Sequence, residues 1–228
     1  MAESREQLDG DGVTLFVLDG DDVGRGEFLD AVVAERYATQ VYFRRVHGAS
    51  MGSDFWSSSF GGESVSGHLV RCAVGRLRHR RGFYRVMTEA GLVDDAGYAG
   101  CRRRWRRSNE RLDRAVRSGE TVYGLSRYDF DAYLAHEMAD LEERYCADPS
   151  LPGMDVGEDE VGRFLLGLLR GGRGRSLRPD EARAHAVAEL RKQKFVNIVN
   201  KYADGIEVDG VPWRALQALV EQTVGSGA

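Results

Sequence analysis

Apolar side chains near the start of the chain form two short runs with a helix-like pattern between them. Residues 13–18 (VTLFVL) form a continuous apolar run rich in β-forming side chains, which is typical of a buried strand. Residues 27–38 carry apolar side chains at helical spacing, and residues 40–46 (QVYFRRV) form a second β-prone run. A strand, a helix and a strand within about thirty residues predict a βαβ unit with a parallel pair of strands.

The middle of the chain is predicted to hold one long loop and two helices. Residues 48–67 are rich in Gly and Ser and predict the loop. Apolar side chains recur at helical spacing in residues 69–87 and again from Trp105 to Val116, so each stretch is predicted to be a helix. Residues 120–126 (ETVYGLS) predict a short strand.

The last hundred residues are predicted to be mostly helical. Helical spacing of apolar side chains runs through residues 130–145 and 161–168, and Pro179 is predicted to begin a further helix. An Asp209–Gly210 pair predicts a turn between short β-prone flanks, and a final helix is expected after it.

Together these elements predict a mixed α+β fold with a βαβ-like N-terminal portion, basic helices after it and a mostly helical C-terminal half. We expect an α/β portion over residues 1–125, which includes the loop at 48–67 and the arginine-rich helices at 69–117. A helical portion follows over residues 126–224, and residues 225–228 are predicted to be a disordered tail. A length of 228 residues suits one large domain or two small ones.

Several features bear on the compartment in which the protein acts. No apolar run reaches the roughly eighteen residues that a membrane span needs, so we expect no membrane partner. The N-terminal stretch MAESREQLDGDG is acidic and lacks the pattern of a secretory signal, so the cytoplasm is the expected location. Cys72, Cys101 and Cys146 are widely spaced without a CxxC pair, and we expect them to be reduced.

Charge is distributed unevenly along the chain. The chain has 32 basic and 36 acidic residues and a net charge of −4. Residues 69–117 contain 14 basic and 5 acidic residues, net +9, whereas residues 1–68 carry −7 and residues 118–228 carry −6. A basic segment between two acidic flanks predicts a surface that meets a polyanion.

The basic segment has the composition of a nucleic-acid-binding surface. Arginine pairs with phosphate in a planar, two-pronged geometry, and Phe83, Tyr84 and Trp105 are interleaved where they could stack on bases. The partner predicted is nucleic acid, with DNA and RNA left open. An alternative is that these arginines pair with an acidic protein surface or with acidic groups of this chain. The predicted nucleic-acid-binding residues are Arg71, Arg78, Arg80, Arg81, Arg85, Arg102, Arg103, Trp105, Arg106 and Arg107.

A cluster of aspartates follows the first predicted strand in VLDGDDVGRGE, residues 17–27. Asp19, Asp21 and Asp22 would lie at the carboxyl end of that strand, where grouped carboxylates can hold Mg²⁺ or Mn²⁺. The stretch resembles the first strand and acidic motif of NYN/PIN-type nucleases, and residues 42–48 (YFRRVHG) are similar to a following strand in that family. The resemblance implies metal-dependent hydrolysis of nucleic acid. The alternative is a polar turn whose aspartates cap the next helix.

A second resemblance concerns the FGGES turn, which contains Glu63. It is similar to the Gly-Gly-acidic turn of palm-type nucleotidyl cyclases, where it works with an early aspartate. The candidate catalytic residues are therefore Asp19, Asp21, Asp22 and Glu63, and the candidate metal ligands are Asp19 and Asp21. No cofactor is expected unless this enzymatic alternative holds, in which case it would be Mg²⁺ or Mn²⁺.

Three functions remain open at this point. The first, which the charge distribution favours, is a nucleic-acid-binding protein without catalytic activity. The second is a structural or assembly protein, such as a virion component or another homo-oligomer, whose basic surface faces nucleic acid or an acidic neighbour. A virion location would then replace the cytoplasm. The third is a divalent-metal-dependent nuclease or nucleotidyl-transfer enzyme.

Overall fold

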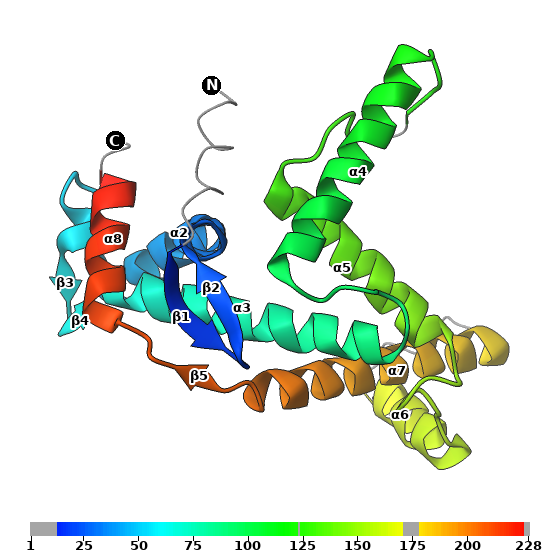
Figure 1. The fold of residues 1–228 in the computed structure, drawn as a ribbon. Helices are drawn as coiled ribbons and strands as arrows, with labels where there is room; N and C mark the ends of the chain where they lie inside the picture. Colours follow the sequence, from blue (N-terminus) through cyan, green and yellow to red (C-terminus); the bar gives the residue numbers. More distant parts are fainter. Residues whose placement is uncertain (1–12, 123, 171–177, 226–228) are drawn as a thin grey trace. The chain divides into compact units, whose positions relative to one another are not determined.

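The computed structural model describes residues 13–122, 124–170 and 178–225, which form mostly helices and a small antiparallel sheet (Figure 1). The predicted α+β class is confirmed in this helix-dominated form. The chain divides into two compact units, residues 1–80 with 205–228 and residues 81–204. The division falls within a helix, whereas the sequence placed a boundary at residue 125.

The first described element of the first unit is a β-hairpin. Strands β1 (Thr14–Leu18) and β2 (Asp21–Gly24) pair antiparallel and are joined by a two-residue turn at Asp19 and Gly20. Both turn residues have positive φ, 54° and 81°, which is the geometry of a type I′ turn. Asp-Gly is a favoured sequence for this turn because its twist matches that of the flanking strands.

The predicted βαβ unit is wrong, because residues 40–46 are helical. They belong to helix α2 (Arg25–His47), whose buried side chains include Val32, Thr39 and Phe43. This spacing continues one helical face through the β-prone residues, so tertiary packing decides their conformation. The third strand is β5 (Val208–Asp209), which pairs antiparallel with β1 to give the order β2-β1-β5.

The segment predicted as a long loop contains short regular elements. A 3₁₀-helix, η2 (Phe55–Ser57), precedes a hairpin of β3 (Ser59–Phe60) and β4 (Glu63–Ser64). Helix α8 (Trp213–Gly225) packs against η2. Phe55 and Trp56 enter the core of the first unit, so aromatic burial orders a Gly- and Ser-rich segment. Other members of this core are Phe16, Leu18, Phe28, Val32, Phe43, Leu69, Leu77, Ile206, Leu216 and Val220.

Helices make up the regular structure of the second unit. Helix α3 (Val65–Glu89) enters it from the first unit. The remaining helices of this unit are α4 (Tyr98–Arg117), α5 (Phe130–Ala147), α6 (Glu158–Arg170) and α7 (Pro179–Asp204). Helix α5 packs against α4 and α7, and α6 packs against α7. The core of this unit includes Tyr84, Met87, Leu134, Leu141, Tyr145, Phe195 and Val199.

Each predicted helix is present, and a second predicted strand, besides that at residues 40–46, is not found among the described residues. Residues 120–126 contain no strand among the described positions, which exclude Tyr123. Asp129 begins α5 by accepting a hydrogen bond from Ala132 N at 2.8 Å, which satisfies a donor of the first helical turn. Within the described ranges, no helix has an apolar stretch long enough to cross a lipid bilayer. Residues 226–228 of the predicted disordered tail lie outside those ranges.

Two glycines of α3 allow a matched test of how closely α3 and α7 pack. A Cβ atom added at Gly82 would lie 2.6 Å from Ala203 N, whereas one added at Gly75 would meet no atom within 4 Å. We expect Gly82→Ala to lower the free energy of unfolding by about 2 kcal/mol, because overpacking would push the helices apart. Gly75→Ala should raise it by about 0.8 kcal/mol through the higher helix propensity of alanine. Urea unfolding measures both changes, and stabilisation by Gly82→Ala would contradict the close crossing.

Candidate functional site

Helix α4 carries half of the residues predicted to bind nucleic acid, and its two faces have different surroundings. Gly100, Cys101 and Asn109 are buried on the inner face, and Arg104 and Trp105 are half-buried beside them. The outer face is exposed and rich in arginine. The inner face therefore determines how the outer face is presented.

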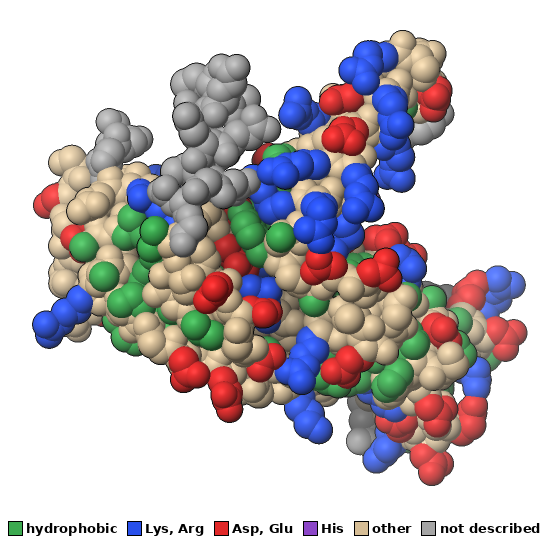
Figure 2. Space-filling model, in the orientation of Figure 1, with side chains coloured by type: hydrophobic (Ala, Val, Ile, Leu, Met, Phe, Trp, Pro, Cys, Tyr) green, Lys and Arg blue, Asp and Glu red, His purple; other side chains and the backbone are tan. Residues whose placement is uncertain are grey.

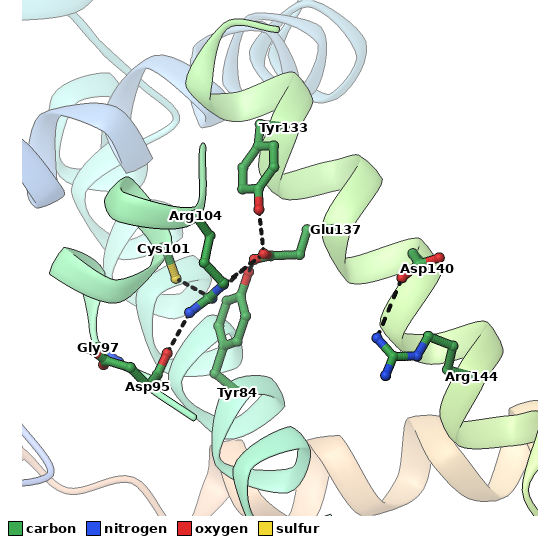
Figure 3. Close-up of polar contacts among 9 residues, drawn as sticks. All are labelled: Tyr84, Asp95, Gly97, Cys101, Arg104, Tyr133, Glu137, Asp140 and Arg144. Carbon is green, nitrogen blue, oxygen red and sulfur yellow. Dashed lines mark hydrogen bonds and ion pairs between the residues drawn. The ribbon is translucent and has the colours of Figure 1, made fainter. Parts of the chain in front are cut away.

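The central contact of the inner face is an ion pair between Arg104 and Glu137 of α5 (Figure 3). Arg104 donates from Nε to Oε1 at 2.7 Å and from Nη2 to Oε2 at 3.1 Å, so the pair is bidentate. Arg104 Nη1 donates to the carbonyl oxygen of Asp95 at 2.7 Å, and Nη2 also contacts Cys101 Sγ at 3.3 Å. Each nitrogen of the guanidinium thus has a partner within the second unit.

Two tyrosines complete the surroundings of Glu137. Tyr133 donates its hydroxyl to Oε1 at 2.5 Å, and the fully buried Tyr84 of α3 donates to Oε2. Burial by itself raises the pKa of Glu137, but hydrogen bonds from Arg104, Tyr133 and Tyr84 outweigh it and hold the pKa below the usual value. Burial and the neighbouring carboxylate raise the pKa of both tyrosines. They therefore stay protonated and able to donate at neutral pH.

This cluster joins three helices, because Tyr84 comes from α3, Arg104 from α4, and Tyr133 and Glu137 from α5. The side chain of Glu137 is only 11% exposed, so the charge depends on its protein partners rather than on water. A buried pair of this kind is sensitive to geometry, since displacement of either helix would leave a charge without its partner. We interpret the cluster as the clamp that orients α4.

The remaining polar and aromatic groups of the inner face are also used inside the unit. Trp105 Nε1 and Asn109 Nδ2 each donate to the carbonyl oxygen of Tyr128 at 2.9 Å. Asn109 Oδ1 accepts from Tyr128 N at 2.9 Å, which fixes the segment before α5. The guanidinium of Arg102 lies 4.7 Å from the ring centres of both Trp105 and Phe130. Trp105 therefore packs inward instead of forming an exposed stacking surface.

The outer side of α4 carries an exposed arginine surface. Figure 2 shows the basic side chains gathered along this helix. Arg103 forms an ion pair with Asp95. Within the described part of the chain, no carboxylate forms an ion pair with Arg107, Arg111, Arg114 or Arg117. We call this surface the α4 arginine face, and its members are Arg103, Arg106, Arg107, Arg111, Arg114 and Arg117.

The predicted binding arginines of α3 lie in different surroundings. Arg71 pairs with Glu63 at 2.6 Å, and the buried Arg80 pairs with the buried Glu27 at 2.6 Å. Arg85 pairs with Glu89 at 3.5 Å. Arg81 is buried and Arg78 is half-buried. Several of these arginines thus have intramolecular acidic partners, which is the alternative that the sequence left open.

The candidate catalytic carboxylates have structural contacts as well. Asp19 lies in the hairpin turn, and Asp21 and Asp22 lie at the start of β2. The backbone N–H of Asp19 donates to the carbonyl oxygen of Glu207 at 3.0 Å. Glu63 accepts from Tyr42 Oη at 3.0 Å. Among the described residues, no group of three or more His, Cys, Asp and Glu side chains is placed to hold a metal ion.

Glu63 lies at the centre of a second polar cluster, within the first unit. It hydrogen-bonds with His68 Nδ1 at 2.9 Å and accepts from Arg71 Nη2 at 2.6 Å. The ring of His68 stacks on that of Tyr42 with 4.3 Å between centres. The hydrogen bond with His68 is the main reason that the pKa of Glu63 lies below its usual value. The cluster ties the β3–β4 hairpin to α2 and α3.

Sequence reasoning did not select Arg104 or Glu137. The signal available was the position of Glu137, which shares the apolar face of its helix with Phe130, Leu134 and Leu141. A charged residue on such a face requires a buried partner. The periodicity therefore indicated that Glu137 was unusual, without indicating which basic residue it meets.

Comparison with known proteins gives one informative relative. The chain is 30% identical over 205 residues to the "Chaperone for lacto-N-biosidase" of Bifidobacterium longum subsp. longum. The alignment covers 89% of this chain and 73% of that protein. No protein-family model matches the chain, and no solved structure matches it.

This relative corrects the function predicted from composition. A chaperone acts on a protein, so the nucleic-acid-binding function, nucleic acid as the partner and the virion-component alternative are wrong. The metal-dependent nuclease alternative belongs to the same contradicted function. Its aspartates were expected at the carboxyl end of a strand in a parallel pair, but they lie in the turn and the second strand of an antiparallel hairpin. The physical source of the error is that the local excess of arginine includes side chains whose charges are balanced inside the fold.

The importance of the clamp can be tested with a matched pair of substitutions on α5. Glu137→Gln leaves the half-buried Arg104 without a counter-charge and should lower the free energy of unfolding by about 3 kcal/mol. Asp140→Asn removes the partner of Arg144 in an exposed pair with 3.8 Å between the charged atoms, so it should change that energy by less than about 0.5 kcal/mol. Urea unfolding of both variants measures the difference. Equal effects would show that the clamp is not structural.

The same carboxylate predicts a dependence of stability on pH. The pKa of Glu137 in the folded protein lies below the usual glutamate value of 4.5. The carboxylate therefore contributes fully to the free energy of unfolding above that pH, and this contribution is lost as the pH falls through the folded pKa. The difference in unfolding free energy between wild type and Glu137→Gln should therefore be constant at neutral pH and shrink as the solution is acidified below about pH 4. Urea titrations at a series of pH values test this prediction. A difference in unfolding free energy between the two proteins that stays constant on acidification would contradict it.

Proposed function

This chain belongs to the family of the Bifidobacterium longum chaperone for lacto-N-biosidase, and from that premise we propose that it is a chaperone with a protein client. The observation that carries the proposal is the extent of the similarity, 205 residues. The larger unit spans residues 81–204, so an alignment of that length includes residues of both units. The proposal therefore concerns the whole architecture and not one motif.

We propose that the client is an enzyme of the lacto-N-biosidase kind, which is the client that the relative's name specifies. A chaperone needs a surface that recognises an incompletely folded chain more strongly than the finished product. It lowers the concentration of aggregation-prone intermediates without changing the stability of the native client. Such a role requires stable recognition surfaces and no chemical step.

Exposed side chains on the helices support this role. Tyr37 is 76% exposed and Val33 is 47% exposed one turn before it on α2. Leu166 of α6 is 56% exposed, and the α4 arginine face is exposed on the second unit. Tyr and Arg are enriched in protein–protein interfaces, where both combine contact area with polar bonding. Each unit thus offers side chains suited to a polypeptide partner.

Co-expression with a defined client tests the proposal. Bifidobacterium longum lacto-N-biosidase would be expressed alone, with this chain, or with its own chaperone as the positive control. We expect this chain to raise the amount of soluble, active enzyme several-fold over the enzyme expressed alone, because fewer molecules aggregate before they fold. The readout is activity per cell together with the soluble fraction. No rise with this chain, in an experiment where the positive control succeeds, would contradict the assignment of this client.

A further inference from the structure

We infer that the α4 arginine face is the docking surface for a carboxylate-rich segment of the client polypeptide. The identity of the partner as a client rests on the proposed function, whereas the anionic character of the partner rests on the structure. The partner is an acidic protein segment, and tighter binding of another anion, such as nucleic acid, would contradict it.

The geometry of the face suits a linear partner. The exposed positions 103, 107, 110, 114 and 117 follow one another by three or four residues, which places them on one side of the helix. The span from Arg103 to Arg117 corresponds to roughly 21 Å at the rise of an α-helix. An extended segment of about six residues or a helix of about four turns would cover that distance. Glu110 is the one acidic side chain among these five positions.

The charges of this face repel one another over part of its length, although Glu110 and Asp113, which stand four residues before Arg114 and Arg117, offset the repulsion near the end of the helix. Arg103 and Arg107, and likewise Arg107 and Arg111, stand four residues apart, and like charges at this spacing destabilise a helix. Among the described residues, Arg107, Arg111, Arg114 and Arg117 have no carboxylate partner, in contrast to Arg104 on the inner face. Carboxylates of a partner would remove this repulsion on binding. Repulsion among these arginines is therefore weaker in the complex than in the free protein, and this difference favours binding of an anionic partner.

The aromatic side chains distinguish carboxylates from nucleic-acid bases as the partner. Phe83 and Tyr84 are buried, and Trp105 donates to Tyr128 O on the inner side. Among the described residues, these aromatic side chains therefore give the α4 arginine face no exposed ring on which an unpaired base could stack. Guanidinium groups without such rings still match carboxylates, with which they form charge-assisted, often bidentate, hydrogen bonds.

The clamp gives the face a fixed orientation before any partner arrives. Arg104, Trp105 and Asn109 attach α4 to α5 and to the segment preceding it through the hydrogen bonds described above. A helix that is already ordered loses little further backbone freedom when it binds. The outward arginines can therefore form contacts without the cost of ordering their backbone.

A binding measurement with a defined probe tests the anionic preference. Fluorescently labelled poly-L-glutamate would be titrated with the full chain, and we expect binding that weakens steeply as salt is raised. The variant Arg107→Glu/Arg111→Glu/Arg114→Glu should bind at least about tenfold more weakly. The control Arg45→Glu/Arg163→Glu/Arg214→Glu makes the same change in net charge at exposed sites elsewhere and should bind like wild type. Unfolding curves establish that both variants are folded, and equal weakening in both would overturn the inference.

The co-expression assay then separates this inference from the proposed function. If wild type and the control variant rescue lacto-N-biosidase and the α4 variant does not, the face is the docking surface. If all three rescue it equally, the chaperone function stands and the inference is overturned. If wild type does not raise lacto-N-biosidase activity while the relative's chaperone does, the assigned client is wrong. The inference about docking of that client is then wrong as well. Binding of a single-stranded oligonucleotide more tightly than poly-L-glutamate would also overturn the choice of partner.

Discussion

The second unit depends on one largely buried charge pair, Arg104 with Glu137. Removing two opposite charges from water is favourable only where their remaining polar atoms are also bonded, and this cluster meets that condition through Tyr84, Tyr133 and the Asp95 carbonyl. Because the participants come from α3, α4 and α5, their geometry fixes the rotation of α4 about its own axis. The exposed arginines of that helix point outward because Arg104 points inward.

Arginine thus serves two purposes in this chain, and the distinction explains how an acidic protein contains a strongly basic segment. Four arginines of the basic segment pair with carboxylates that lie outside residues 69–117, in the acidic flanks, so the net charge of the segment overstates the unbalanced charge at its surface. These pairs are Arg71–Glu63, Arg76–Glu35, Arg80–Glu27 and Arg104–Glu137. Among the described residues of this segment, Arg107, Arg111, Arg114 and Arg117 form no ion pair with a carboxylate, and all four lie on α4. That remaining charge, and not the charge of the segment as a whole, is what a binding partner would meet.

The sequence predicted the helices well, because their apolar spacing reflects burial of one face. It failed at residues 40–46, where β-prone side chains continue the buried face of α2 that includes Phe43. The Asp19–Gly20 turn had a local signal, the Asp-Gly pair, which was interpreted as part of a ligand cluster. The clamp could not be predicted in full, since Arg104 and Glu137 are 33 residues apart and only the fold determines their pairing. The relation to a chaperone could not be predicted from any single motif, because it rests on similarity to the relative over 89% of this chain.

The order of segments in the first unit has a consequence for biosynthesis. Its core combines Phe28 and Leu69 with Leu216 and Val220, so residues from both ends of the chain must be present before it can close. The second unit is continuous from residue 81 to residue 204 and is fully synthesised earlier. Domains fold as units while the nascent chain leaves the ribosome, N-terminal parts first where they are complete. Here the interior unit is therefore the first able to mature, and the hairpin of β1 and β2 cannot complete its core until α8, which follows the second unit in the sequence, has been synthesised.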